Sequence, residues 1–435
     1  MKLQKIISFA AAMSLSAQLW AQGEVVTLQH LWDEAERNST SIKVMKSELN
    51  AANLAVEAAK SGNLPDLNAS LSIGYLGDGV LTDRNFKKSL HVDNPHFMNS
   101  FSVQASQLIY GGGAVKNAVK TAESGRNIAA LNLESERQNL RLMIAGYYLD
   151  ICRLWNQTAV LDENLRLCGV VIENMRVMEA QGTALSNDIL RYELQKEGLL
   201  LSKRKVSDGL QILYRRIATA TGYEGINDFA PDTVQIAQII ENLNDTTLQN
   251  SYADNGVNVR ISQEAAYLAE NQLKTIKSGM LPQVAVIAED HFDGPITIEV
   301  PVIDKNFNYW FAGIGVKYSI SSLYKTKRDV RRAEISLQAA NDRIALAKER
   351  AGDDVFAAHT DFFTARAEIQ TQQKSVELAS KNYNVTLSRY NNGLATITDM
   401  LDASNTKLNA EILLVDSKIN LLYNYLKIIY LNSQL

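Results

Sequence analysis

The sequence has 435 residues and a formal net charge of −4, which results from 44 basic and 48 acidic side chains. This charge is small for the length, so it gives no argument for nucleic acid or an anionic membrane surface as a partner. The two cysteines, Cys152 and Cys168, would lie about 24 Å apart on one continuous helix, which is too far for a disulfide.

The first residues have the layout of a secretory signal peptide. Two lysines precede an apolar run from Ile6 to about Leu19, and small residues lead to Ala21. The run is too short to span a bilayer as a helix. We therefore predict that residues 1–21 are a cleaved signal peptide and that the protein is exported. No later segment offers about 20 consecutive apolar residues, so no membrane-spanning helix is predicted.

The first half then alternates between helix and strand patterns. A helical pattern over about 27–61 ends at the phrase KSGNLP, in which Gly62 and Pro65 break the helix. Apolar and polar residues alternate over about 66–76 and again over about 99–110. This period of two predicts two strands, each with one apolar face, joined by a polar loop.

Long helices are predicted to follow the second strand. The sequence contains no proline between Pro95 and Pro231, and proline-free stretches can hold long helices because proline removes an amide donor. Apolar residues recur in alternating steps of four and three between Leu140 and Met175, with Cys168 among them. This heptad spacing is typical of coiled-coil packing. It predicts a helix about 70 residues and 100 Å long, then a turn and a shorter return helix.

The second half repeats this order. The phrase KSGMLP lies 217 positions after KSGNLP, and strand patterns at about 283–290 and 309–320 precede another long helix. The sequence thus predicts an internal duplication. We expect a first structural repeat over 22–221, with its strands at 66–76 and 99–110, a linker over 222–244 and a second repeat over 245–435.

Four strands of about ten residues are long enough to span a bilayer, but they cannot close a barrel. Unpaired edges in lipid would cost several kcal/mol per backbone group. Either the strands form a soluble sheet that caps the helices, or several chains combine their strands. Aromatic side chains near the strand ends favour the second alternative, because they suit the membrane interface. These are Tyr75, Phe97, Phe101, Tyr309, Trp310 and Tyr318.

The two helical turns are also related. The segment EAQGTALSND (Glu179–Asp188) parallels YNNGLATITD (Tyr390–Asp399), and in both a glycine precedes an aspartate by six residues. The phrase RYNNGLATITDMLDA (Arg389–Ala403) resembles the second periplasmic turn of the TolC family of outer-membrane efflux ducts. The resemblance covers nearly the whole chain after the signal peptide.

The resemblance implies a mainly α fold with a pair of β hairpins. It also implies that one chain forms one third of a trimer. Three chains would combine four strands each into a twelve-strand barrel in outer-membrane lipid. Their helices would continue as a hollow α-barrel in the periplasm of a Gram-negative-type envelope. The homotrimer would be the exit duct of a tripartite efflux pump or a type I secretion system. Its partners would be a periplasmic adaptor, also called a membrane fusion protein, and an inner-membrane pump, with no cofactor.

The resemblance also implies roles for residues at the turns. Asp399 and Asp402 match acidic residues that narrow the periplasmic mouth, Tyr390 matches an aromatic that helps to close it, and Asp188 is the first-repeat counterpart of Asp399. The turns at Gly182, Gly393 and Ala395 are expected to dock the adaptor. Helix–strand joints are expected at Gly62, Pro65, Gly279, Pro282, Gly111, Gly112 and Gly113.

The turns depart from the family pattern at two positions. Well-known members carry an arginine in the closing network where this sequence has Ala395, and an aromatic residue often stands where it has Met178. We therefore expect the closed mouth to be held differently or less tightly.

Other readings of the sequence are weaker. The five histidines are scattered and no Ser/His/Asp group can be inferred, so we predict no enzyme. His91, Asp93 and His96 are a possible metal set, but a solvated loop explains them better. A soluble periplasmic coiled-coil adaptor or scaffold is the alternative function; an adaptor would usually have one helical hairpin flanked by split β-domains rather than two repeats with strand inserts.

Overall fold

The computed structural model describes residues 25–222, 229–233, 256–433 and 435. The predicted signal peptide, most of the predicted linker and the start of the predicted second repeat lie outside these residues. Among the helices that are described, none is both long and apolar enough to cross a membrane.

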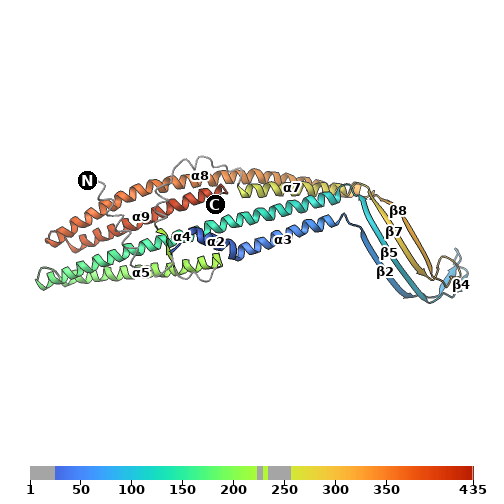
Figure 1. The fold of residues 1–435 in the computed structure, drawn as a ribbon, viewed down its shortest axis with the longest axis horizontal. Coiled ribbons are helices and arrows are strands. Elements are labelled where there is room, and N and C mark those ends of the chain that lie inside the picture. The colour runs from blue at the N-terminus through green and yellow to red at the C-terminus, as the bar shows by residue number, and fades with distance from the viewer. Residues whose placement is uncertain (1–24, 223–228, 234–255, 434) are drawn as a thin grey trace. The chain divides into compact units, whose positions relative to one another are not determined.

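The predicted duplication is visible in the order of the elements (Figure 1). In the first half, α2 (Leu28–Asn38) and α3 (Thr40–Ser61) precede strands β2 (Asp66–Tyr75) and β5 (Phe97–Tyr110), and then α4 (Ala114–Ala180) and α5 (Ser186–Thr221). In the second half, α7 (Val257–Ser278) precedes β7 (Gln283–Gly294) and β8 (Phe307–Lys317), and then α8 (Ser322–Asn391) and α9 (Ile397–Leu431). The short strands are β1 (Val25–Val26), β3 (Gly79–Thr82), β4 (Ser89–Val92) and β6 (Ala230–Pro231).

The chain forms two compact units. Among the described residues, the helical unit comprises 25–47, 131–222, 229–233, 256–260, 346–433 and 435, and the sheet unit comprises 48–130 and 261–345. The mainly helical composition agrees with the predicted fold class.

The sheet unit contains one four-stranded antiparallel sheet with the order β2-β5-β7-β8. Its register aligns Leu71 with Phe101 and Phe101 with Phe292, so apolar side chains from neighbouring strands share a face. This face is exposed in the single chain, with Leu71 67% and Ile314 74% accessible. Within the described residues, β2 and β8 are the two edge strands.

The opposite face of the sheet is polar on β2 and β5, mixed on β7 and largely aromatic on β8. Serines of β2 and β5 face each other, and the Ser70 and Ser102 hydroxyls lie 2.8 Å apart. On β7, His291 stacks on Tyr309 of β8, with ring centroids 5.0 Å apart. Tyr309 and Trp310 therefore lie on opposite faces, and only Trp310 joins the apolar one.

Strand β7 extends four residues beyond the predicted end at residue 290. Its apolar alternation ends there because Asp290 falls on the apolar face, where it accepts a hydrogen bond from Asn308 at 3.0 Å. Backbone pairing with β5 and β8 nevertheless continues to Asp293. The predicted loop after β2 also holds the β3–β4 hairpin, whose four-residue strands are too short to show a period.

The predicted heptad seams form the core of the helical unit. On α4, Ile144 and Ile151 are fully buried, and on α8 Phe362 is 1% exposed. Cys152 and Cys168 are both buried free thiols, so the prediction of a core position for Cys168 is confirmed. Burial raises the pKa of both thiols.

A polar network anchors the short β1–β6 pair to the long helices. The buried Tyr148 hydroxyl donates to the Val26 carbonyl and accepts from the Asp232 amide, both at 2.8 Å. The Tyr214 hydroxyl donates to the Phe229 carbonyl at 2.9 Å and accepts from the Trp155 indole at 3.0 Å. Burial raises the pKa of Tyr148, so this hydroxyl stays protonated and can donate.

Candidate functional site at the two helical turns

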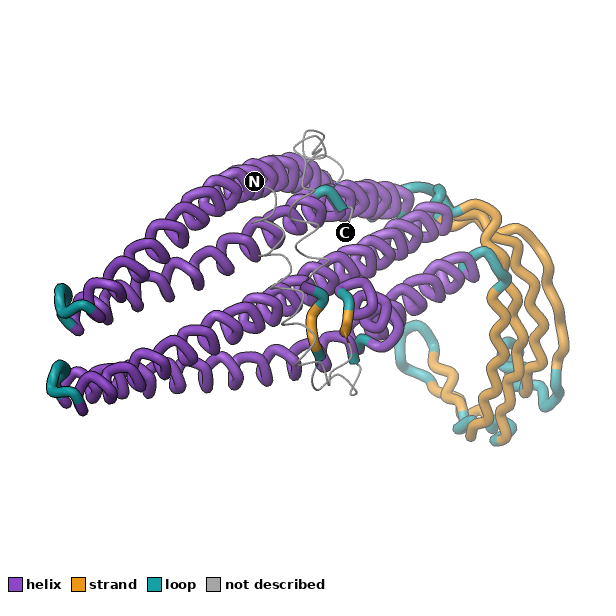
Figure 2. The backbone as a smooth tube through the Cα atoms, turned by 60° about the vertical axis from the view of Figure 1, so that its left-hand side comes forward, coloured by secondary structure: helices purple, strands orange, loops and turns teal. Residues whose placement is uncertain are grey.

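The turns after α4 and α8 have the same backbone geometry. Gly182 and Gly393 adopt left-handed φ values of 76° and 72°. The amide one residue later donates to a carbonyl at the end of the helix, from Thr183 at 2.9 Å and from Leu394 at 2.8 Å. Glycine is the residue that takes this conformation without strain, which explains its presence in both repeats. Both turns lie at the same end of the helical unit, as Figure 2 shows in teal.

The helices that follow the turns begin differently. Thr396 caps α9, and a capping box forms because the Thr396 amide donates to the Asp399 carboxylate at 2.8 Å. This backbone hydrogen bond lowers the pKa of Asp399, together with the bond from the Thr396 hydroxyl. In the first repeat the capping position is Leu185, which offers no side-chain acceptor. The counterparts Asp399 and Asp188 therefore have different local roles.

The four predicted gate residues divide into two groups. Tyr390 is buried, and burial raises the pKa of its hydroxyl, with a further contribution from the charge of Asp188. Asp188 is half-buried, whereas Asp399 and Asp402 are exposed on α9. The structure thus brings Tyr390 near Asp188, and it places Asp399 and Asp402 three residues apart on the exposed side of another helix.

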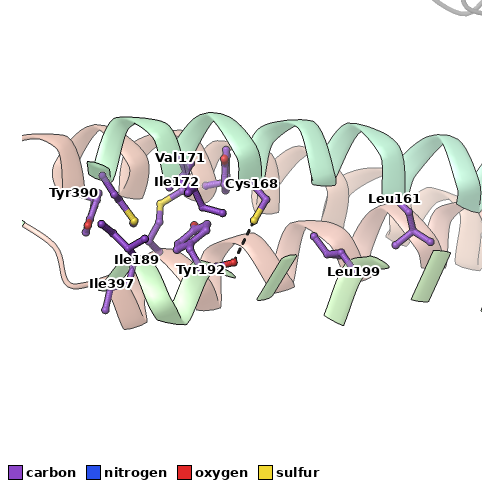
Figure 3. Packing of buried hydrophobic residues seen from close by; sticks show 12 residues of the cluster. Leu161, Cys168, Val171, Ile172, Ile189, Tyr192, Leu199, Tyr390 and Ile397 are labelled. Carbon is purple, nitrogen blue, oxygen red and sulfur yellow. Dashed lines mark hydrogen bonds between the residues drawn. The ribbon is translucent and has the colours of Figure 1, made fainter. Parts of the chain in front are cut away.

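An apolar cluster lies directly under both turns and joins all four helices (Figure 3). Met175 and Met400 are fully buried there, and Ile189 and Ile397 pack around them. Ala395 is partly buried against the same cluster. The position at which the sequence lacks a closing arginine is therefore a packing position here.

Tyr192 is an unusual member of this cluster. Its side chain is 2% exposed, and its hydroxyl has no hydrogen-bond partner within the described part of the chain. Its carbonyl accepts a weak bond from the Cys168 thiol at 3.6 Å, drawn as a dashed line in Figure 3. A buried polar group without a partner costs about 1–3 kcal/mol.

Two arginines near the turns were not identified from the sequence. Arg389 donates to the Leu394 carbonyl at 3.2 Å and braces the second turn. Arg191 of α5 donates to the Thr398 hydroxyl of α9 at 3.0 Å. The internal repeat could have indicated Arg191, because Arg191 in the first half is equivalent to Asp402 in the second half.

The helix–strand joints of the sheet unit also repeat. At each joint, three successive amides donate to the carbonyl three residues earlier. They are the amides of residues 62–64 after α3 and of residues 279–281 after α7. The glycine run lies against the second joint, since a Cβ on Gly112 would come within 2.9 Å of Leu281. A side chain at Gly112 would therefore displace this joint.

His91 on β4 and the loop residues Asp93 and His96 are not placed together as a metal site. His96 stacks on Tyr75 with ring centroids 4.7 Å apart, and its ring lies 3.0 Å from the Leu76 carbonyl. The side chains that the structure describes contain no group of three or more His, Cys, Asp or Glu residues placed to hold a metal ion.

Comparisons with known proteins relate this chain to efflux channels. A family model described as outer membrane efflux protein matches residues 31–183 and 268–428. The outer membrane protein TolC of Vibrio cholerae serotype O1 is 20% identical over 357 residues, which cover 82% of this chain and 78% of the relative.

Solved structures share the fold. The outer membrane protein VceC from Vibrio cholerae has a TM-score of 0.76 and 16% identity, covering 93% of this chain and 96% of that one. The Campylobacter jejuni CmeC outer membrane channel has a TM-score of 0.74 and 13% identity, covering 94% and 85%.

The buried tyrosines Tyr148 and Tyr192 differ in their hydrogen bonding and provide a matched test. Tyr148→Phe removes two hydrogen bonds from a buried position, so it should lower the free energy of unfolding by about 1–3 kcal/mol. Tyr192→Phe removes a hydroxyl that has no partner, so it should leave stability unchanged or raise it. Thermal unfolding in mild detergent measures both, and a clear loss of stability in Tyr192→Phe would show that its hydroxyl is paired.

The need for glycine at the turns can be tested by comparing an alanine substitution at a turn with one at a glycine inside a helix. Gly393→Ala should destabilise the protein by about 1–2 kcal/mol, because alanine is strained at positive φ. Gly352→Ala, in the interior of α8 with open space around it, should stabilise by up to about 1 kcal/mol through helix propensity. Equal shifts in the unfolding temperature of the two variants would contradict the assigned turn geometry.

Proposed function

Since this chain belongs to the outer membrane efflux protein family and is an outer-membrane exit duct of tripartite efflux pumps, we propose that three copies close one duct. The family sets aside the alternative of a soluble adaptor or scaffold. The proposal concerns the number of copies, the closure of the sheet and the residues that form the periplasmic mouth.

The open sheet is the observation that carries this proposal. Each chain contributes four paired strands. Among the described residues, the outer backbone edges of β2 and β8 have no paired strand, so a neighbouring chain can pair with them. In lipid, unpaired backbone groups along these edges would cost several kcal/mol each. Pairing of β2 in one copy with β8 in the next removes this cost, and three copies give a closed barrel of twelve strands. The exposed apolar face would then meet the lipid, and the polar face would line the lumen.

The helical unit supports the same assembly. On α5, Leu190, Leu194 and Leu201 are 59%, 75% and 57% exposed at helical spacing. On α8, Phe356 and Phe363 are seven residues apart and 75% and 50% exposed. Such apolar stripes on long helices need a partner helix. A ring of identical subunits provides one, because each copy offers both stripes.

We assign the mouth of the duct to the two turns. In three copies, Asp399 and Asp402 would form two stacked rings of carboxylates around the axis. Carboxylate rings favour the passage of cations over anions, and like charges that converge on a narrow axis repel each other. Tyr390 and Asp188 would hold the turns closed beside these rings. Docking of a periplasmic adaptor on the Gly182 and Gly393 turns would move them apart and connect the duct to an inner-membrane pump.

The stoichiometry has a direct test. Chemical crosslinking and mass measurement in mild detergent should give three chains per particle, because three open sheets are needed to close the barrel. A stable monomer in lipid, or another stoichiometry, would contradict the proposed closure.

The acidic mouth is tested by charge neutralisation. Asp399→Asn with Asp402→Asn should reduce cation selectivity and block by multivalent cations in planar bilayers. Asp402→Asn alone removes one ring and leaves the capping box of α9 intact. The double variant Asp342→Asn with Asp353→Asn, on α8 outside the turns, is a charge-matched control. If selectivity and block in the mouth variant equal those of the wild type, the constriction lies elsewhere.

A further inference from the structure

Two side-chain hydrogen bonds join α5 of the first repeat to α9 of the second, close to the turns. The Arg191 guanidinium donates to the Thr398 hydroxyl at 3.0 Å. The Gln195 side-chain amide, one turn further along α5, donates from Nε2 to the Asn405 side-chain oxygen Oδ1 at 2.7 Å. Both pairs lie within the helical unit. They connect the hairpin of α4 and α5 with the hairpin of α8 and α9.

Further from the turns, side chains of α4 rather than α5 donate hydrogen bonds to α9 of the other hairpin. Asn164 donates to Glu411 of α9 at 3.2 Å, and Gln157 donates to Asp416 at 3.0 Å. These two bonds are part-buried, whereas those of Arg191 and Gln195 are exposed. Exposed polar contacts contribute little stability, because water competes for them. At the turn end the hairpins are therefore joined by the buried apolar cluster and by exposed hydrogen bonds that are individually weak.

Arg191 is distinguished by its position in the duplication. The offset of 211 residues that relates Asp188 to Asp399 also relates Arg191 to Asp402. The first repeat thus carries a cation where the second carries an acid. This cation binds Thr398, the residue next to Asp399 in the first turn of α9. Arg389 does not make this connection, since it binds the carbonyl of Leu394 in its own hairpin.

We propose that Arg191, through its hydrogen bond to Thr398, is a positioning residue of the mouth. It holds the turn end of α5 against that of α9 and thereby fixes the position of the Asp399 and Asp402 carboxylates. Loss of the bond shifts the two hairpins toward a wider arrangement. The inference rests on the proposed function, because it concerns the same turns.

The test is a double-mutant cycle in planar bilayers. Arg191→Ala and Thr398→Val each remove the bond from one side, and each should raise the conductance of the closed channel about two- to fivefold. The double variant should show no more than the effect of either single change, because both remove the same contact. Arg191→Lys keeps the charge and a donor, and it should restore most of the wild-type behaviour.

Arg176→Ala is the matched control. Arg176 of α4 pairs with Glu193 of α5 at 3.0 Å, so its removal breaks an arginine contact within one hairpin and leaves the cross-hairpin bond. Its conductance should equal that of the wild type. Additive effects of Arg191→Ala and Thr398→Val, or an equal increase in Arg176→Ala, would overturn the proposal.

A second measurement does not depend on conduction. Spin labels at the exposed positions Asn187 and Thr406, in a background with Cys152 and Cys168 replaced by alanine, report the distance between α5 and α9. Arg191→Ala should lengthen or broaden this distance, and Arg176→Ala should not. If the distance changes while the wild type forms no channel, the proposed function fails and the positioning role stands. An unchanged distance in Arg191→Ala contradicts the positioning role.

Discussion

Backbone hydrogen bonding at the edges of the four-stranded sheet is the constraint on which the rest of this structure depends. Water can satisfy the outer groups of β2 and β8, but lipid cannot. A chain with an exposed apolar sheet face therefore needs partners that pair both edges. Duplication of the hairpin gives four strands, and the joints at KSGNLP and KSGMLP each connect the helix before a strand pair to the first strand of that pair.

The two repeats share the same backbone geometry at the turns but carry different side chains at equivalent positions. Both turns use a glycine at positive φ, but only the second has a capping box, and this difference separates Asp399 from Asp188. The first repeat has Arg191 where the second has Asp402. Under the turns, Ala395 packs against an apolar cluster that contains Tyr192, whose hydroxyl has no partner among the described residues. The turn region is thus built from packing and a few exposed polar contacts, which suits its proposed role as the mouth of the duct.

Local patterns predicted much of the fold. The heptad steps located buried residues such as Ile144 and Phe362, because a repeated spacing describes one helix face. The alternation in β2 located its strand for the same reason. The end of β7 was missed because Asp290 interrupts the apolar face while the backbone ladder continues. The Arg191 contact was missed because its partner lies 207 residues away, and no local pattern reports such a pair. Tyr192 was not identified from the sequence, and only the structure shows that its hydroxyl has no partner among the described residues.

The most direct test of edge pairing between chains is a cysteine scan across the two edges. Ser70→Cys on β2 would be combined, one at a time, with cysteines at Phe307, Tyr309, Phe311, Gly313 and Gly315 of β8, with Cys152 and Cys168 replaced by alanine. Oxidation should link different chains at one or two adjacent β8 positions and give covalent trimers. Crosslinks within a single chain, or no crosslink at any position despite reactive thiols, would contradict the account.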